Sequence, residues 1–154
     1  MTTARTDTSR VIRARPDQLY DAFIDPDVLV AWLPPAEMTG VIHELDARVG
    51  GGYQMSLFYP PTERTFRGKT AEKEDRVEVR FLELERPRRI VEAVRFVTTD
   101  PAFFGEMTIT TTLSEAPGGT RVAMTFENLP SGLRPEDNEA GARSSLAQLA
   151  RRFE

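Results

Sequence analysis

EDNEAGARSSLAQLARRF, residues 136–153, is the stretch that decides the fold. Its second half spaces apolar side chains three, four and seven residues apart, which puts them on one stripe of an α-helix: Leu146, Leu149, Ala150 and Phe153. Acidic residues crowd the start of the segment, and Arg151 and Arg152 stand at its end, a charge order that the helix dipole favours. We therefore expect a long C-terminal helix with one apolar face to bury.

The chain before this helix shows the period-two alternation of apolar and polar side chains that is typical of β-strands. The alternating runs lie at residues 41–46, 53–59, 77–86, 90–96, 107–113 and 122–126. Turn residues such as Gly118-Gly119 separate the runs, so most strands should pair with their neighbours in sequence. Residues 64–75 are polar and charged, and we interpret them as a loop or an exposed ribbon.

Two short helices are predicted between a first strand, at residues 10–14, and this run of strands. Residues 16–23 have apolar side chains at helical spacing, and Asp25-Pro26 ends that helix. Residues 27–33 form a second helical piece. It ends before Pro34-Pro35, because the residue before a proline is pushed out of the helical region.

This order of elements predicts an α+β fold. A curved antiparallel sheet of about six to seven strands should wrap around the long C-terminal helix, because a sheet with one apolar face must bury that face. Since a strongly twisted sheet curls around a single helix, space can remain between the two near the short helices. We expect this cup to be the binding site.

Length and composition restrict the class of protein. The 154 residues fit a single domain, which we expect over residues 9–154 after a polar, flexible tail of residues 1–8. A net charge of -4 gives no basic field for phosphates, so we expect no nucleic-acid partner. The apolar runs are too short for a membrane span and the N-terminus lacks a signal sequence, so the expected location is the cytoplasm. With one histidine and no cysteine, we expect neither a transition-metal site nor a cofactor.

Several motifs occur together over residues 9–153. They include DARVGGGY at 46–53, ERPRRI at 85–90 and GGT at 118–120, together with Trp32. In this combination the chain resembles the START-like, or SRPBCC, superfamily, and within it the branch named for the C-terminal domain of the activator of the heat-shock chaperone ATPase. The resemblance implies a helix-grip fold whose cavity, in many members, holds apolar or amphipathic small molecules. It implies no single chemistry, because relatives include carriers, cyclases, hormone receptors and co-chaperone domains.

Two features near the last helix set this chain apart within the branch it resembles. The run RPEDNEAG, residues 134–141, looks like a signature of uncharacterised bacterial members. Gly141 is followed by Ala142, where this branch often has Gly-Trp. The loss of that bulk means that the cavity shape of relatives does not carry over directly.

Three polar residues are candidates for chemistry. His43 is the only histidine, and the alternation puts it on the same face as Val41 and Leu45, so we expect it at the cup as an acid, a base or a hydrogen-bonding group, or else as a structural histidine. Glu92 interrupts an apolar strand face, so it should be paired, meet a polar ligand, or be turned outward by a bulge. Tyr53 offers a hydroxyl at the cup wall.

The predicted cavity lining combines these residues with apolar side chains from both layers. It comprises Trp32, His43, Tyr53, Met55, Glu92, Phe96, Met124, Leu146 and Leu149. The apolar members could equally be ordinary core, because the sequence does not report volume.

Three functions are compatible with these patterns. The leading hypothesis is a non-enzymatic binding protein for an apolar or aromatic small molecule. The second is a cofactor-independent cyclase, dehydratase or hydrolase that uses His43 with Glu92 or Tyr53 in the same cavity. The third, ranked last, is a co-chaperone-like interaction module that associates with a chaperone through an exposed apolar surface. Formation of a homodimer is left open.

Overall fold

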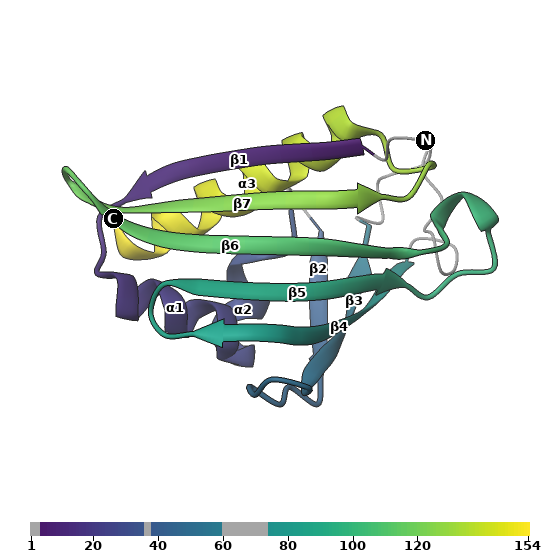
Figure 1. The fold of residues 1–154 in the computed structure, drawn as a ribbon, viewed down its shortest axis with the longest axis horizontal. Helices are drawn as coiled ribbons and strands as arrows, with labels where there is room; N and C mark the ends of the chain where they lie inside the picture. The colour runs from purple at the N-terminus through teal and green to yellow at the C-terminus, as the bar shows by residue number, and fades with distance from the viewer. Residues whose placement is uncertain (1–3, 36–37, 60–73) are drawn as a thin grey trace.

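A seven-stranded antiparallel sheet covered by a long helix makes up the described part of the chain in the computed structural model (Figure 1). The structure describes residues 4–35, 38–59 and 74–154. In chain order the elements are β1 (Ala4–Ile12), α1 (Pro16–Ile24), α2 (Pro26–Trp32), β2 (Thr39–His43), β3 (Gly52–Phe58), β4 (Glu74–Glu85), β5 (Arg89–Phe96), the short 3-10 helix η1 (Pro101–Phe103), β6 (Glu106–Ala116), β7 (Gly119–Leu129) and α3 (Pro135–Phe153). Among the described residues, no helix has both the length and the apolarity needed to cross a bilayer.

The strand order in the sheet is β1-β7-β6-β5-β4-β3-β2. Strands β2 to β7 therefore pair with their neighbours in sequence, and β1 joins the far edge beside β7. In Figure 1, β2 and β3 cross the direction of β5, β6 and β7, and α3 lies behind the sheet alongside β1 and β7. The predicted α+β helix-grip architecture is confirmed.

The first strand begins earlier than predicted. β1 starts at Ala4 and pairs with β7 up to Ile12, so residues 4–8 belong to the sheet and our expectation of a tail there was wrong. An edge strand exposes most of its side chains and needs no apolar alternation, which is why the polar sequence concealed it. Thr6 is nevertheless buried, and its Oγ1 accepts a hydrogen bond of 2.7 Å from Asn138 Nδ2 on α3.

The segment 64–75 lies mostly outside the described residues. Only its last two residues are described, and they start β4, so at this end the segment expected as a loop or an exposed ribbon is part of a strand of the sheet. Asp75 pairs with Leu57 of β3 and is buried.

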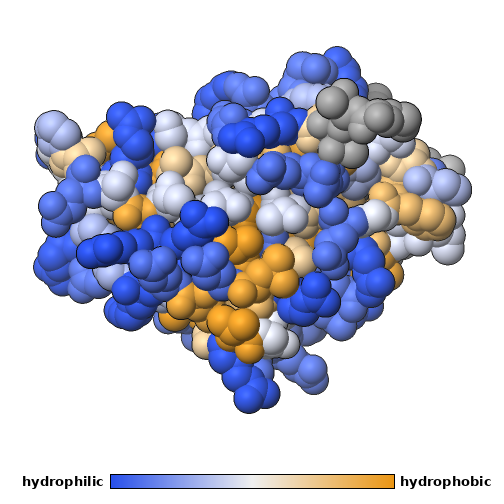
Figure 2. Space-filling model, viewed as in Figure 1, coloured by the Kyte–Doolittle hydropathy of each residue, from blue (hydrophilic) through white to orange (hydrophobic). Residues whose placement is uncertain are grey.

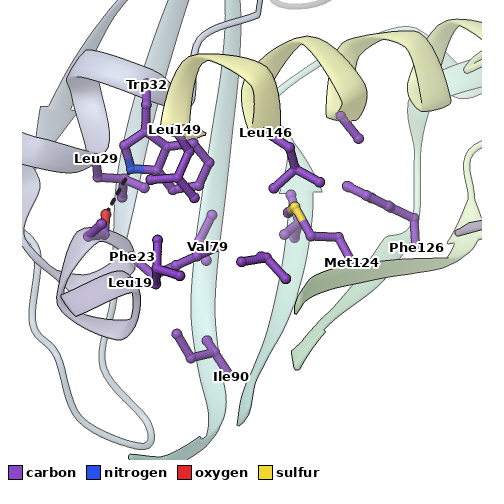
Figure 3. Close-up of a cluster of buried hydrophobic side chains, with 14 of the residues drawn as sticks. Leu19, Phe23, Leu29, Trp32, Val79, Ile90, Met124, Phe126, Leu146 and Leu149 are labelled. Carbon is purple, nitrogen blue, oxygen red and sulfur yellow. Dashed lines mark hydrogen bonds between the residues drawn. The ribbon is translucent and has the colours of Figure 1, made fainter. Parts of the chain in front are cut away.

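The C-terminal half of α3 holds the helix on the sheet. Leu146 and Leu149 are fully buried in the core beside Trp32, and Figure 3 shows Leu146 pointing toward Met124 of β7. The indole N–H of Trp32 donates a 2.9 Å hydrogen bond to the Ala22 carbonyl, so its polar atom is satisfied inside the core. Complete burial of side chains of this size stabilises the fold by roughly 1.5 to 3 kcal/mol each.

Polar contacts fix the same half of α3 to the end of α2. Gln148 Nε2 donates to the carbonyl oxygens of Trp32 and Pro34, at 2.8 and 2.7 Å. Ser145 Oγ donates to the Leu33 carbonyl at 2.6 Å. These bonds satisfy carbonyl groups that the end of a helix leaves free.

Candidate ligand cavity

A cavity of about 960 Å³ lies between the inner face of the sheet and the N-terminal half of α3. This volume is at the upper end of the range of small-molecule sites. Its apolar wall comes mainly from alternate residues of five strands: Met55, Leu57, Val77, Val79, Val94, Phe96, Met107, Ile109, Met124 and Phe126. Phe103 of η1 also lines the cavity and meets Phe96 edge-on, with ring centroids 6.0 Å apart.

Small residues on α3 keep this space open. Gly141, Ala142 and Ser145 line the cavity, whereas the next residue along the helix, Leu146, is in the packed core. Glycine has no side chain and that of alanine is a single methyl group, so neither reaches across to the sheet. A gap therefore remains under the first half of the helix, whereas larger side chains fill the space under the second half. The predicted effect of alanine at position 142, a cavity unlike that of relatives with a tryptophan there, fits this arrangement.

A buried carboxyl group faces the cavity from the centre of the sheet. Glu92 of β5 is 6% exposed, and the Tyr53 hydroxyl donates a long hydrogen bond of 3.4 Å to its Oε2. Burial raises the pKa of Glu92 to about 7, against a smaller lowering by the Tyr53 hydrogen bond. The pKa of Tyr53 is also raised. The largest cause is burial, and the charge of Glu92 and the hydrogen bond to Glu92 act in the same direction. The pair is therefore a proton donor and acceptor set inside apolar walls.

A second pair of the same kind lies farther along the same wall. The Tyr59 hydroxyl donates a 2.7 Å hydrogen bond to Asp75 Oδ2, and Asp75 is 4% exposed. Burial, helped by this bond, raises the pKa of Tyr59. Six residues of extended chain separate Tyr53 from Tyr59, roughly 20 Å. The cavity wall thus has two buried tyrosine–carboxyl pairs, with the apolar side chains of Met55 and Leu57 between the two tyrosines along the chain.

The remaining charged lining residues are exposed. They are Asp100 before η1, and Arg134 and Asp137 at the start of α3. Arg134 forms an ion pair with Glu136 at 3.0 Å. Among the described residues, the lining therefore holds four carboxyl groups and one cation, which already has an acidic partner.

Apart from His43, the predicted lining residues divide into two groups. Tyr53, Met55, Glu92, Phe96 and Met124 lie on the cavity wall. Trp32, Leu146 and Leu149 do not line the cavity and are packed in the core instead, because the C-terminal half of α3 and helix α2 close against each other.

His43 lies on the opposite face of the sheet from the cavity, so the prediction that it lines the cup was wrong. It pairs with the exposed Gln54, whereas its neighbour Ile42 pairs with Met55 on the cavity wall. Opposed side chains share a face, so His43 points away from Glu92. The strand is at the sheet edge and apolar on both faces, with Val41 47% exposed, so alternation gave no reliable face. The structure brings Glu92 and Tyr53 together, without His43.

Sequence reasoning missed the Tyr59–Asp75 pair, and it left Gly141, Ala142 and Ser145 out of the predicted lining. Asp75 shares the alternation of Val77 and Val79, a signal that the neighbouring charges concealed. For Gly141 and Ala142, the available signal was the absence of the tryptophan that the branch often has.

Comparison with known proteins connects this geometry to a family. A family model described as "Activator of Hsp90 ATPase homolog 1-like protein" matches residues 13–154. A solved structure of a Chromobacterium violaceum protein is 33% identical, covers 97% of this chain and 96% of its own, and has a TM-score of 0.85. Structures from Rhodobacter sphaeroides (20% identical, covering 96% of this chain and 90% of that chain, TM-score 0.76) and Mycobacterium smegmatis (17%, 99% and 91%, 0.77) share the fold. No functionally curated protein matches the sequence.

Proposed function

Because the chain belongs to the activator of Hsp90 ATPase homolog 1-like family of the START-like, or SRPBCC, superfamily, we propose that it binds a small molecule with an apolar or aromatic body between the sheet and α3. The fold of this family commonly binds ligands. The observation that carries the proposal is the cavity of about 960 Å³ with largely apolar walls and a buried polar pair. Water against such walls is unfavourable by roughly 25 cal/mol for each Å² of apolar surface, so an apolar ligand that displaces it gains free energy.

A titration with the neutral fluorescent probe N-phenyl-1-naphthylamine tests the proposal. The wild type should bind one probe per chain, with enhanced and blue-shifted emission. Ala142→Trp should weaken binding by roughly tenfold or more, because the indole fills cavity volume beside the helix. Val41→Trp adds the same side chain at an exposed site of β2 that does not line the cavity, and should leave binding unchanged.

Circular dichroism melting of each variant separates loss of the cavity from loss of the fold. If folded wild type binds no apolar probe, or if both tryptophan variants bind as the wild type does, the cavity is not a ligand site. If the wild type does bind the probe, native mass spectrometry of protein purified from its own host would identify the molecule that the cavity retains.

A cofactor-independent enzyme is the second candidate, and the observation that favours it is the Tyr53–Glu92 pair. A carboxyl group with a pKa of about 7 can give and take a proton near neutrality, as a general acid–base group must. His43 has no part in this version, because it lies on the other face of the sheet. If the host-retained molecule is converted by the wild type but not by Glu92→Gln, the enzymatic function is supported; unchanged mass with both proteins supports binding alone.

The co-chaperone-like alternative has weaker support. It needs a large exposed apolar surface. The outer face of the sheet, shown in Figure 2, is mainly hydrophilic apart from a patch over β4 and β5.

A further inference from the structure

We propose that the cavity selects ligands that carry a basic nitrogen, which Glu92 and Tyr53 bind while the apolar body of the ligand lies along the strand residues toward α3. This inference rests on the proposed binding function and names the chemical class of its ligand.

The hydrogen bonding of Glu92 leaves room for such a group. Its Oε2 accepts only the 3.4 Å bond from Tyr53, and within the described residues its Oε1 accepts no hydrogen bond. No arginine, lysine or histidine among those residues forms an ion pair with it. A buried carboxylate without a cation costs several kcal/mol, and a ligand cation would relieve that cost. The group that would best complement Glu92 is therefore a positively charged hydrogen-bond donor on the ligand.

The charges around the cavity point in the same direction. Glu92, Asp100 and Asp137 line it, and the single lining cation in the described ranges, Arg134, is paired with Glu136. A cavity lined by one sign of charge concentrates ligands of the other sign and repels those of its own. Within the described residues, a fatty acid or another amphiphilic anion would meet this field without a free cation to receive its carboxylate.

The chemistry of the pair also fits a protonated amine. An ammonium group donates up to three hydrogen bonds, and bonds to a carboxylate are the shorter and stronger charge-assisted kind. The Tyr53 hydroxyl can accept one of these bonds, or keep its own bond to Glu92 while the ammonium binds Oε1. Tyr53 lies against Phe81, with ring centroids 5.9 Å apart, and opposite Val79, so the amine site is anchored in regular strands.

Three eight-carbon probes that differ only in the end group test the proposal: octylamine, 1-octanol and octanoate. Each is titrated at pH 8, where Glu92 is mostly ionised, to displace N-phenyl-1-naphthylamine from the wild type. Octylamine should displace the probe at a concentration roughly tenfold lower than 1-octanol, and octanoate should be the weakest. Glu92→Gln should abolish the preference for the amine and leave 1-octanol unchanged.

Glu78→Gln is the matched control. It removes the same charge from β4 on the outer face, where Glu78 pairs with Arg95, and should keep the amine preference. If Glu92→Gln fails to fold, Tyr53→Phe replaces it and should reduce the preference, because it removes only the hydroxyl. Octanoate binding as tightly as octylamine overturns the inference but leaves the binding function standing. An amine preference that survives Glu92→Gln also overturns it, whereas no binding of any probe removes both proposals.

Discussion

Glu92 couples a single proton to the stability of the fold. Its pKa is about 7 in the folded protein, against an ordinary value of 4.5, and the cause is burial. The unfolded chain therefore loses this proton at lower pH than the folded chain does. The stability associated with the protonated carboxyl is complete below about pH 4.5 and is lost as the pH rises through about 7. The difference of pKa corresponds to roughly 3 kcal/mol, since each unit is about 1.4 kcal/mol.

Replacing Glu92 by glutamine should remove this pH dependence. The amide has the same shape and cannot ionise, so the free energy of unfolding of Glu92→Gln, relative to ligand-free wild type, should rise by roughly 2 to 3 kcal/mol from pH 5 to pH 8. Urea denaturation followed by circular dichroism at the two pH values measures it. Glu78→Gln, on the outer face of the sheet, should show nearly the same difference from wild type at both pH values. If the difference for Glu92→Gln is also the same at pH 5 and pH 8, the pKa of Glu92 is not raised in the folded protein.

Position in the sheet explains why the alternation placed Glu92 on the face where the structure has it, although an outward turn was left open, and placed His43 on the wrong face. Glu92 lies on β5, which has neighbours on both sides, and its face is fixed by Ile90 and Val94. His43 lies on β2 at the edge, where apolar residues occur on both faces. Alternation identifies a face only where one side of a strand is clearly more apolar than the other.

Along α3, the two halves of one helix have different tasks. The C-terminal half packs into the core and is anchored to α2 through Gln148, while the N-terminal half faces the cavity with small side chains. The apolar stripe that predicted the helix marks only the packed half. The stripe therefore predicted correctly which part of the helix packs on the sheet. We wrongly expected its residues Leu146 and Leu149 to line the cavity, which lies under the N-terminal half of the helix.

Gly141→Ala should stabilise the protein without closing the cavity. A glycine inside a helix costs about 0.5 to 1 kcal/mol relative to alanine. A Cβ atom at Gly141 would meet only Pro35 Cβ, at an ordinary 3.9 Å. The free energy of unfolding should rise by roughly that amount, and probe affinity should stay the same. Ala142→Gly, the reverse change one residue later, should destabilise the helix by a similar amount; a loss of stability in Gly141→Ala would mean that the helix is held differently at this point.

The boundaries of elements were predicted best where turn chemistry marks them. Asp25-Pro26 separates α1 from α2 as expected, because Pro26 starts the second helix and Asp25 Oδ1 accepts a 3.0 Å hydrogen bond from the Asp27 amide. β1 has no such mark at its start. Its pairing is set by backbone hydrogen bonds to β7, which a polar sequence forms as readily as an apolar one.

At the scale of the whole molecule, β1 ties residues 4–12 to the last elements. It pairs with β7 along its length, and it contacts α3 through the bond from Asn138 to Thr6. Asp7 also accepts a 2.8 Å hydrogen bond from Thr125 of β7. The sheet, the helix that covers it and the N-terminal segment are thus parts of one folding unit.

Removal of residues 1–8 should therefore destabilise the entire fold. The deletion takes away backbone pairing with β7 and two side-chain hydrogen bonds, each with a net value of about 1 kcal/mol, so we expect a loss of roughly 2 to 4 kcal/mol in urea denaturation. Arg5→Ala removes only exposed ion pairs, one to Asp7 in the same strand and one to Glu127 of β7, and should change the stability by less than about 1 kcal/mol. If the truncated chain is as stable as the full one, residues 1–8 contribute nothing to the fold, as the expectation of a flexible tail requires.

The separation of packing and cavity along α3 has a consequence for how this protein can change. Substitutions at Ala142 and the facing strand residues alter the shape offered to a guest molecule, while Trp32, Leu146 and Leu149 lie outside the cavity lining. Ligand preference can thus be varied without replacing Trp32, Leu146 or Leu149, which hold the helix on the sheet. Such a host is well suited to diversification by natural drift, and to the laboratory redesign of small-molecule sensors.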